Sequence, residues 1–231
     1  MIKELNVVVV VPSMGTWHAE FAMSLIGLVG YFQNVQVPGA QTQALRVINK
    51  RGSILPNLRL AGLKDAIALN ATHLLWIDSD HQFPPNLLNR LLACERDVVA
   101  ANCAIKTIPS MPTARAFDPK DSKGQPVYTD WNSKGLERVW RIGTGIMLMS
   151  RRAFMQIPHN AFSMLYMEET DSYRGEDWGV CEALEKAGCP IFIEHEISNE
   201  CSHIGNFHYT HEYVGHFQVP EGVEEGVAGA Q

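Results

Sequence analysis

The stretch His73-Leu-Leu-Trp-Ile-Asp-Ser-Asp80 decides the fold. Residues 74–77 are continuously apolar, which predicts a strand that is buried on both faces, as the inner strands of parallel sheets are. Two carboxylates follow this strand directly. Because ligands of parallel α/β sheets bind beyond the carboxyl ends of the strands, Asp78 and Asp80 mark a candidate site.

Strands and helices alternate on both sides of this stretch. Short apolar or β-branched runs predict strands over residues 6–11, 34–37, 97–101, 139–150 and 190–194. Apolar residues at helical spacing predict helices over residues 17–28, 57–70, 87–92 and 176–187. This alternation predicts an α/β fold in which a mostly parallel, Rossmann-like sheet is flanked by helices.

Two segments interrupt the alternation. Residues 107–138 are rich in Pro, Asp, Ser, Lys and Gly, and we interpret them as a long excursion or short hairpin of the same domain. The expected strand over 139–150 contains Gly143 and Gly145. Their missing side chains allow a ligand or another backbone to approach closely.

Length and composition are those of one folded domain. The chain has 231 residues, of which 46% are hydrophobic and 19% charged, which excludes a protein that is disordered throughout. We expect a single domain over residues 1–218, followed by a disordered tail, 219–231, that is rich in Gly, Glu, Val and Ala. The net charge of −6 and the lack of a basic block argue against nucleic acid as the first partner.

Cysteines and apolar stretches bear on the compartment. The five cysteines include no C-x-x-C pair, which favours reduced thiols and a cytoplasmic protein. The most apolar N-terminal stretches are interrupted by Pro12, His18 and Glu20. We therefore expect no transmembrane segment and no secretory signal.

Asp78 and Asp80 are two residues apart, so strand geometry can direct both carboxylates to the same side while Ser79 points away. Two oxygen ligands on one side suit Mg²⁺ or Mn²⁺. The alternative is a turn with two solvated aspartates, which is a frequent origin of such short motifs. The apolar strand before the pair and the α/β context favour the metal site.

A second acidic pair, Glu176-Asp177, follows Gly175 and opens an expected helix. Carboxylates in a first helical turn interact favourably with the helix dipole, so capping alone is an alternative explanation of the pair. A general base requires a carboxylate in a partly dry cleft. Trp178 could supply the apolar wall that raises the pKa of such a group.

His203 follows the last expected strand and lies between Ser202 and Ile204. The chain has nine histidines, and a lone histidine is most often structural. The cysteines and histidines also lack the paired spacing of a zinc site. By spacing alone, His203 is therefore no stronger a candidate than its neighbours.

Several motifs together resemble those of the GT-A-fold, nucleotide-sugar-dependent glycosyltransferases. They are the opening strand 7–13, Ser53-Ile-Leu-Pro-Asn-Leu-Arg59, His73 to Asp80, Phe83-Pro-Pro85, Gly143-Thr-Gly-Ile146, Gly175-Glu-Asp177 and Ser202-His-Ile-Gly205. The resemblance extends over residues 7–205. It is strongest to small bacterial or phage-type members similar to glycosyltransferase family two, and it implies a GT-A-type fold.

The resemblance also implies site residues. In that family a D-x-D pair and a late histidine hold a divalent metal on the donor diphosphate, which implies Asp78, Asp80 and His203 as metal ligands. An E-D pair supplies the general base for the acceptor, which implies Asp177 with Glu176 beside it. The implied donor contacts are Pro12, Ser13, Arg59, Ser79, Gly143 and Gly145.

Two departures from the family pattern concern the donor. The family's common Arg-Asn pair is Arg59-Leu60 in this chain, which keeps the guanidinium and removes the amide. No acidic residue ends the expected strand 34–37, where many relatives contact the nucleotide base. The identity of the nucleotide therefore stays open.

The resemblance implies an enzyme that uses Mn²⁺ or Mg²⁺ to transfer a sugar from a nucleoside-diphosphate donor to a hydroxyl acceptor. A base opposite the leaving group favours inversion at the anomeric carbon. The acceptor classes are a polysaccharide, a lipid-linked sugar, a protein or, less favoured, modified DNA. The alternatives are a sugar nucleotidyltransferase, although the turn Pro12-Ser-Met-Gly-Thr16 lacks its basic residues, and a non-catalytic nucleotide-sugar-binding module.

Overall fold

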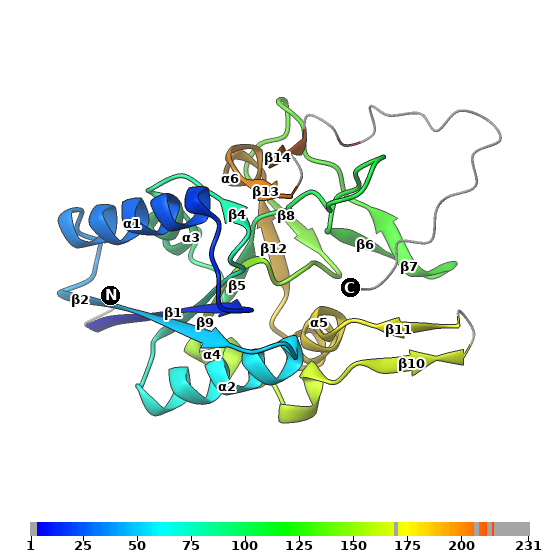
Figure 1. Cartoon of the computed structure of the whole chain (residues 1–231), viewed down its shortest axis with the longest axis horizontal. Helices are drawn as coiled ribbons and strands as arrows, with labels where there is room; N and C mark the ends of the chain where they lie inside the picture. The colour runs from blue at the N-terminus through cyan, green and yellow to red at the C-terminus, as the bar shows by residue number, and fades with distance from the viewer. Residues whose placement is uncertain (1–3, 169–170, 206–207, 212–213, 215–231) are drawn as a thin grey trace.

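A seven-stranded sheet is the centre of the computed structural model, which describes residues 4–168, 171–205, 208–211 and 214 (Figure 1). In spatial order its strands are β2 (Thr42–Arg51), β1 (Glu4–Ser13), β3 (His73–Ile77), β9 (Ile146–Ser150), β5 (Val98–Ala100), β12 (Ile191–Glu194) and β8 (Leu136–Val139). β1 is parallel to β2 and β3, and β5 is parallel to β12. β9 is antiparallel to both neighbours, as β8 is to β12. The predicted α/β fold with a mostly parallel, Rossmann-like sheet is confirmed.

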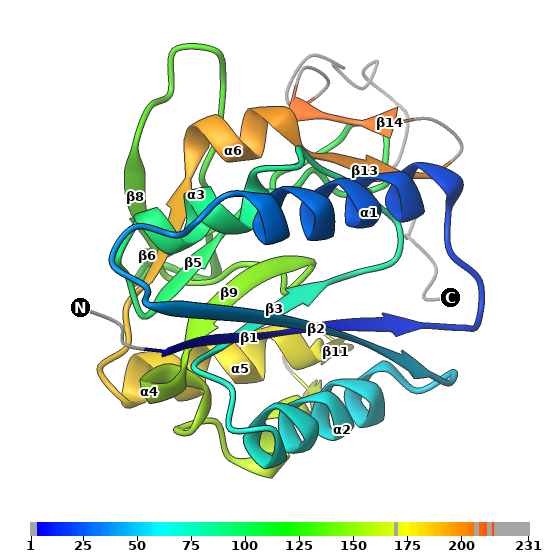
Figure 2. The same ribbon diagram turned by 90° about the vertical axis from the view of Figure 1, so that its left-hand side faces the viewer.

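Helices cover both faces of this sheet (Figure 2). One face carries α1 (Ala19–Asn34), α3 (Leu87–Ala93) and α6 (His195–Glu200), and the other carries α2 (Leu55–Ala68), α4 (Arg151–Phe154) and α5 (Glu176–Lys186). Successive residues of β1 enter two different cores, with Val8 and Val10 on the α2 side and Val7, Val9 and Val11 on the α1 side. A strand between two cores must be apolar at every position, which explains the valine run.

Smaller sheets are attached to the central one. A three-stranded sheet contains β4 (His81–Gln82), β13 (Ser202–Ile204) and β14 (His208–Tyr209), and two hairpins are formed by β6 (Arg115–Asp118) with β7 (Asp121–Pro126) and by β10 (Leu165–Met167) with β11 (Ser172–Arg174). A short 3-10 helix, η1 (His159–Phe162), precedes β10. The β6–β7 pair is the hairpin that the sequence predicted as one form of the 107–138 excursion.

Two strand predictions are wrong. Residues 34–37 contain the last residue of α1 and part of a loop. The second strand of the chain is β2, which begins at Thr42. β2 lies at the edge of the sheet, where its residues are half-buried or exposed, so its polar sequence lacks the apolar run of an inner strand. Of the expected strand 139–150, only residues 146–150 form a strand, β9; Val139 ends β8, which is separated from β9 in the sheet by β5 and β12.

Part of the sequence-based expectation lies outside the described residues. The tail 219–231, expected to be disordered, belongs to that part, and the single domain over 1–218 stays a prediction. Within the described ranges, no helix combines the length and the apolar character that a bilayer crossing requires.

Two glycines in helices should respond oppositely to alanine. A Cβ at Gly179 in α5 would lie 2.0 Å from the backbone oxygen of Ala161, whereas one at Gly30 in α1 would meet no atom within 4 Å. We expect Gly179→Ala to lower the free energy of unfolding by about 1–3 kcal/mol through overpacking. Gly30→Ala should raise it by about 0.5–1 kcal/mol through helix propensity. Urea denaturation measures both, and equal effects would contradict this packing of α5.

Candidate functional site

A cavity of about 130 Å³ opens where β3 ends. Its lining combines the first turns of α2 and α5, the loop between β8 and β9, and the small sheet that contains β4 and β13. Of the residues singled out from the sequence, those that line it are Arg59, Asp78, Gly143, Gly145, Glu176, Asp177 and His203. The cavity thus joins motifs that lie more than a hundred residues apart in the chain.

Arg59 is a buried cation in the lining of this cavity. Its side chain is buried, with Nη2 3.0 and 3.1 Å from the two carboxylate oxygens of Asp78 and Nε 3.2 Å from Oε1 of Glu176. Its Cζ also lies 5.4 Å from the centre of the Trp76 ring. Burial alone would lower the pKa of Arg59, but the two carboxylates reverse this and raise the pKa above its ordinary value. Arg59 is therefore a permanent cation that orders both acids.

Three side chains form a possible metal-binding group: Asp80, His81 and His203. One ligand atom from each lies within 4.8 Å of the others. β4 and β13 pair so that His81 lies opposite His203, and their rings stack with centroids 4.3 Å apart. Asp80 Oδ1 is 3.2 Å from His81 Nδ1, and Asp80 Oδ2 is 3.2 Å from His203 Nε2.

The protonation states of this group suit a cation. Burial by itself would raise the pKa of Asp80, but the adjacent His203 and His81 rings lower it far below its usual range. Burial lowers the pKa of His81, which keeps its imidazole neutral. His203 Nδ1 lies 3.0 Å from the Ala104 carbonyl, which leaves Nε2 to face Asp80 Oδ2. A metal ion bound there would replace any proton that Nε2 carries, because an imidazole binds a metal only through a nitrogen without its proton.

The residues therefore fit a divalent cation. Asp80 Oδ1 and His81 Nδ1 are both buried and make no hydrogen bond of good geometry within the described residues, although the two atoms are close. One oxygen and two imidazole nitrogens favour a borderline metal such as Mn²⁺ over Mg²⁺. Sequence reasoning missed His81. Its position directly after the D-x-D pair was the available signal.

Asp78 takes a different place from its neighbour Asp80. Its carboxylate is bound to Arg59, and Asp78 is not part of the three-residue group. β3 ends at Ile77, so residues 78–80 form a turn in which the alternation of strand side chains no longer holds. The role of Asp78 as a metal ligand stays a prediction.

Lys106 already places a positive charge at the metal-binding group. Its Nζ lies 2.6 Å from Asp80 Oδ2, the same oxygen that faces His203. Its side chain is 37% exposed, so the ammonium can turn towards solvent. A divalent cation bound through that oxygen would have to displace it.

Asp177 also lines the cavity and lies in the first turn of α5. Its Oδ1 accepts a hydrogen bond from the Trp178 backbone N–H at 2.8 Å. Burial, with a further contribution from the negative charge of Glu176, raises the pKa of Asp177 to about 6. A carboxylate with such a pKa can take up and release a proton near neutral pH.

Two glycines near the cavity leave space that the side chains of His81 and Asp177 occupy. A Cβ at Gly145 would lie 2.8 Å from His81 Cε1, and one at Gly175 would lie 2.7 Å from Asp177 Oδ1. At Gly143 a Cβ would come within 3.8 Å of Asp177 Oδ2. Of Gly143 and Gly145, only at Gly145 is the missing side chain needed, by the His81 ring, and the expected approach of a ligand to both glycines stays a prediction.

Three other predicted donor contacts do not line the cavity. Pro12 and Ser13 end β1, where the Ser13 hydroxyl donates to Asn49 Oδ1 at 2.7 Å. Ser79 lies in the turn between β3 and β4. Their roles stay predictions, and the partner Asn49 belongs to β2, which the sequence analysis did not recognise.

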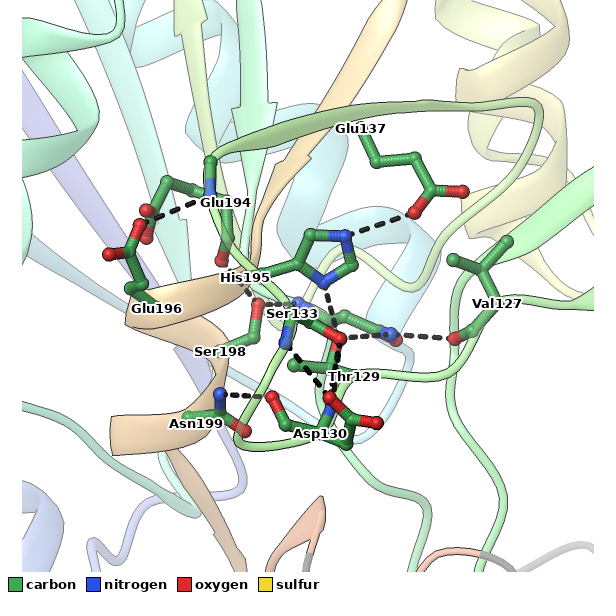
Figure 3. A network of polar contacts seen from close by, with 12 residues as sticks. Val127, Thr129, Asp130, Ser133, Glu137, Glu194, His195, Glu196, Ser198 and Asn199 are labelled. Carbon is green, nitrogen blue, oxygen red and sulfur yellow. Dashed lines mark hydrogen bonds and ion pairs between the residues drawn. The ribbon is translucent and has the colours of Figure 1, made fainter.

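A buried polar network fastens the excursion to the sheet (Figure 3). The His195 ring lies between Thr129 and Glu137, with Nδ1 3.0 Å from the threonine hydroxyl and Nε2 3.0 Å from the carboxylate. Asn102 extends the network. Its amide nitrogen donates to the Thr129 hydroxyl at 3.1 Å, and its Oδ1 accepts from the Ala114 N–H at 3.0 Å. The excursion is thereby held beside the cavity.

Comparison with known proteins finds similarity in structure alone. The chain matches no family model and no curated sequence. Similar solved structures include A197 from STIV, with a TM-score of 0.54, 14% identity and coverage of 87% of both chains. At this identity the similarity shows the shared fold only.

Two further structures are less similar. A mutant of Drosophila β1,4-galactosyltransferase 7, in complex with manganese, UDP-Gal and xylobiose, has a TM-score of 0.49 and 15% identity, over 87% of this chain and 71% of that one. The nucleoside-diphosphate-sugar pyrophosphorylase from Vibrio cholerae RC9 has a TM-score of 0.46 and 10% identity, over 86% and 95%.

The three-residue group predicts the effect of His81 on metal binding. We expect His81→Ala to weaken Mn²⁺ binding by at least about tenfold, because even changes behind the ligands cost about 10- to 100-fold in metal affinity. His208→Ala is the matched control, since this histidine lies on the adjacent strand β14 outside the group. Electron paramagnetic resonance of free Mn²⁺ measures both affinities. Wild-type affinity in His81→Ala would remove this residue from the site.

The ion pair of Lys106 leads to the opposite prediction. Lys106→Met should strengthen Mn²⁺ binding by about three- to tenfold, because it removes a cation that competes for Asp80. Lys134→Met serves as the control, since Lys134 faces Glu196 at 4.0 Å and does not line the cavity. The same Mn²⁺ titration applies, and a weaker affinity in Lys106→Met would contradict the competition.

Proposed function

We propose that this protein is a metal-dependent glycosyltransferase of GT-A type, which transfers a sugar from a nucleoside-diphosphate donor to a hydroxyl acceptor with inversion. One observation carries the proposal: Asp177, a carboxylate with a pKa of about 6, lines the same cavity as two members of the metal-binding group, His81 and His203. Sugar transfer needs both a group that deprotonates the acceptor and a cation at the leaving diphosphate.

The metal-side residues have a defined task in this reaction. Asp80, His81 and His203 would hold Mn²⁺, or Mg²⁺ with lower preference, and the bound ion neutralises charge that develops on the leaving diphosphate. Ala104 orients the His203 ring through its carbonyl. Lys106, once displaced from Asp80, remains near enough to contact an anionic donor.

The acid-side residues act on the acceptor. Asp177 accepts the proton of the acceptor hydroxyl as that oxygen attacks the anomeric carbon, and attack opposite the leaving group inverts that carbon. Glu176 lies beside it and raises its pKa. Arg59 pairs with Glu176 and Asp78, so the acids keep their places without bound ligand. Asp78 stays a proposed metal ligand, and the proposed donor contacts are Pro12, Ser13, Arg59, Ser79, Gly143 and Gly145.

The finer assignments rest on sequence motifs. Membership of glycosyltransferase family two and a bacterial or phage origin stay proposals of this kind, as do the acceptor classes: polysaccharide, lipid-linked sugar, protein or modified DNA. A sugar nucleotidyltransferase is less well supported, because its basic glycine-rich loop is missing after β1. A non-catalytic binding module does not require a carboxylate with a raised pKa, such as Asp177.

Replacing the proposed base tests turnover against binding. Asp177→Asn keeps the size of the side chain and removes proton acceptance, so we expect turnover to fall on the order of 10²- to 10⁴-fold while donor affinity stays unchanged. Release of nucleoside diphosphate from the donor, measured with an acceptor mixture, reports turnover. If Glu176→Gln shows the larger loss and Asp177→Asn is nearly silent, the base is Glu176.

The raised pKa of Asp177 predicts the acid limb of the pH profile. Below pH about 6 the carboxyl is protonated and accepts no further proton, so kcat/KM should fall about tenfold per pH unit there and level off above. The profile is measured with saturating Mn²⁺ at each pH. An acid limb centred near 4 would mean that the base is an ordinary exposed carboxylate.

A further inference from the structure

Two threonine hydroxyls at the cavity make no hydrogen bond with the described residues: Oγ1 of Thr113 and Oγ1 of Thr144. Both oxygens are buried, and the whole Thr144 residue is 2% exposed. Proteins leave few buried polar atoms without a partner, so each such atom requires an explanation. Of the 11 found among the described side chains, four belong to cavity-lining residues, including Arg59 and His81. This concentration points to a polar ligand.

The surrounding backbone holds both threonines in place. The Thr113 N–H donates to the Cys103 carbonyl at 2.9 Å, and the next N–H, that of Ala114, donates to the buried side chain of Asn102. Thr144 lies between Gly143 and Gly145, and a Cβ at Gly143 would come within 3.4 Å of Thr113. The Asp78 N–H donates to the Gly145 carbonyl at 2.8 Å, so backbone hydrogen bonds hold Thr113 itself and the residue that follows Thr144. Neither hydroxyl is taken up by a described protein group.

The charge around the threonines selects the kind of ligand. Carboxylates lie close to the glycines on either side of Thr144. A Cβ at Gly143 would be 3.8 Å from Asp177 Oδ2, and a Cβ at Gly145 would be 3.6 Å from Asp78 Oδ2. Asp78 is paired with Arg59, so the negative charge left beside these glycines is that of Asp177. That carboxylate repels a phosphate, which would instead be drawn towards the metal-binding group and Lys106. A neutral sugar hydroxyl can donate to a carboxylate and pair with a threonine hydroxyl at the same time.

We propose that Thr113 and Thr144 hydrogen-bond hydroxyl groups of the sugar being transferred, and so determine which donor sugar the protein accepts. This inference rests on the proposed function, because that reaction requires the sugar to lie between the metal-bound diphosphate and Asp177. The cavity, about 130 Å³, is smaller than the roughly 300–1,000 Å³ of sites that enclose a whole small molecule. It has room for part of a donor only.

Calorimetry on threonine-to-valine variants tests the proposal. The probes are the uridine, guanosine or thymidine diphosphate sugar that binds wild type most tightly in the presence of Mn²⁺, and the same nucleoside diphosphate without sugar. Thr144→Val and Thr113→Val keep the shape and remove the hydroxyl. Thr210→Val is the matched control, since its buried Oγ1 also makes no hydrogen bond with a described residue and Thr210 does not line the cavity.

We expect Thr144→Val and Thr113→Val each to weaken binding of the nucleotide sugar by about tenfold, the usual effect of one lost hydrogen bond. Binding of the nucleoside diphosphate should stay within about twofold of wild type, and Thr210→Val should change neither. Without ligand, Thr144→Val should melt at or above the wild-type temperature, because a buried hydroxyl without a partner is destabilising.

Other outcomes overturn the proposal in distinguishable ways. Wild-type affinity for the nucleotide sugar in both variants would overturn it and leave the proposed function intact. The same holds if the variants raise only the KM of the acceptor, since the hydroxyls then contact the acceptor. A lower melting temperature of Thr144→Val without ligand would assign that hydroxyl a structural role. If no nucleotide sugar binds wild type with Mn²⁺, the proposed function itself fails.

Discussion

The buried guanidinium of Arg59 is the interaction on which the rest of the site depends. It joins α2, the end of β3 and the first turn of α5 by bonding Asp78 and Glu176 at once. Removing one partner from such a buried group typically costs about 3–5 kcal/mol, because the remaining charges are left without compensation. Asp78, Glu176 and Asp177 would repel one another in one cavity. The positive charge of Arg59 offsets this repulsion.

The same arrangement separates two kinds of chemistry. Arg59 bonds Asp78 and Glu176 directly, whereas burial and the negative charge of Glu176 raise the pKa of Asp177 to about 6. At the other side, Asp80 has His81, His203 and Lys106 around it and stays ionised. A basic carboxylate and a cation-binding group thus adjoin one cavity. A donor that carries a diphosphate and a neutral sugar matches this division of charge.

Sequence reasoning succeeds where burial imposes a simple pattern and fails where partners are distant. β1 and β3 are recognisable because strands between two cores are apolar throughout, whereas the edge strand β2 is polar and was missed. Arg59, Asp177 and His203 were identified through motifs. Yet the bond between Arg59 and Glu176 spans 117 positions, and the pairing of His81 with His203 depends on a two-residue strand. No local pattern encodes either contact.

The central claim is that the cavity binds a nucleotide sugar together with a divalent metal. A thermal-shift screen of nucleotide sugars, with and without Mn²⁺, tests it most directly. At a concentration about 100 times its dissociation constant, a bound donor should raise the melting temperature by about 5–10 °C. The account predicts this rise for at least one donor, with Mn²⁺ only, and its loss in Asp80→Asn. An equal rise without Mn²⁺, or none with any donor, would contradict it.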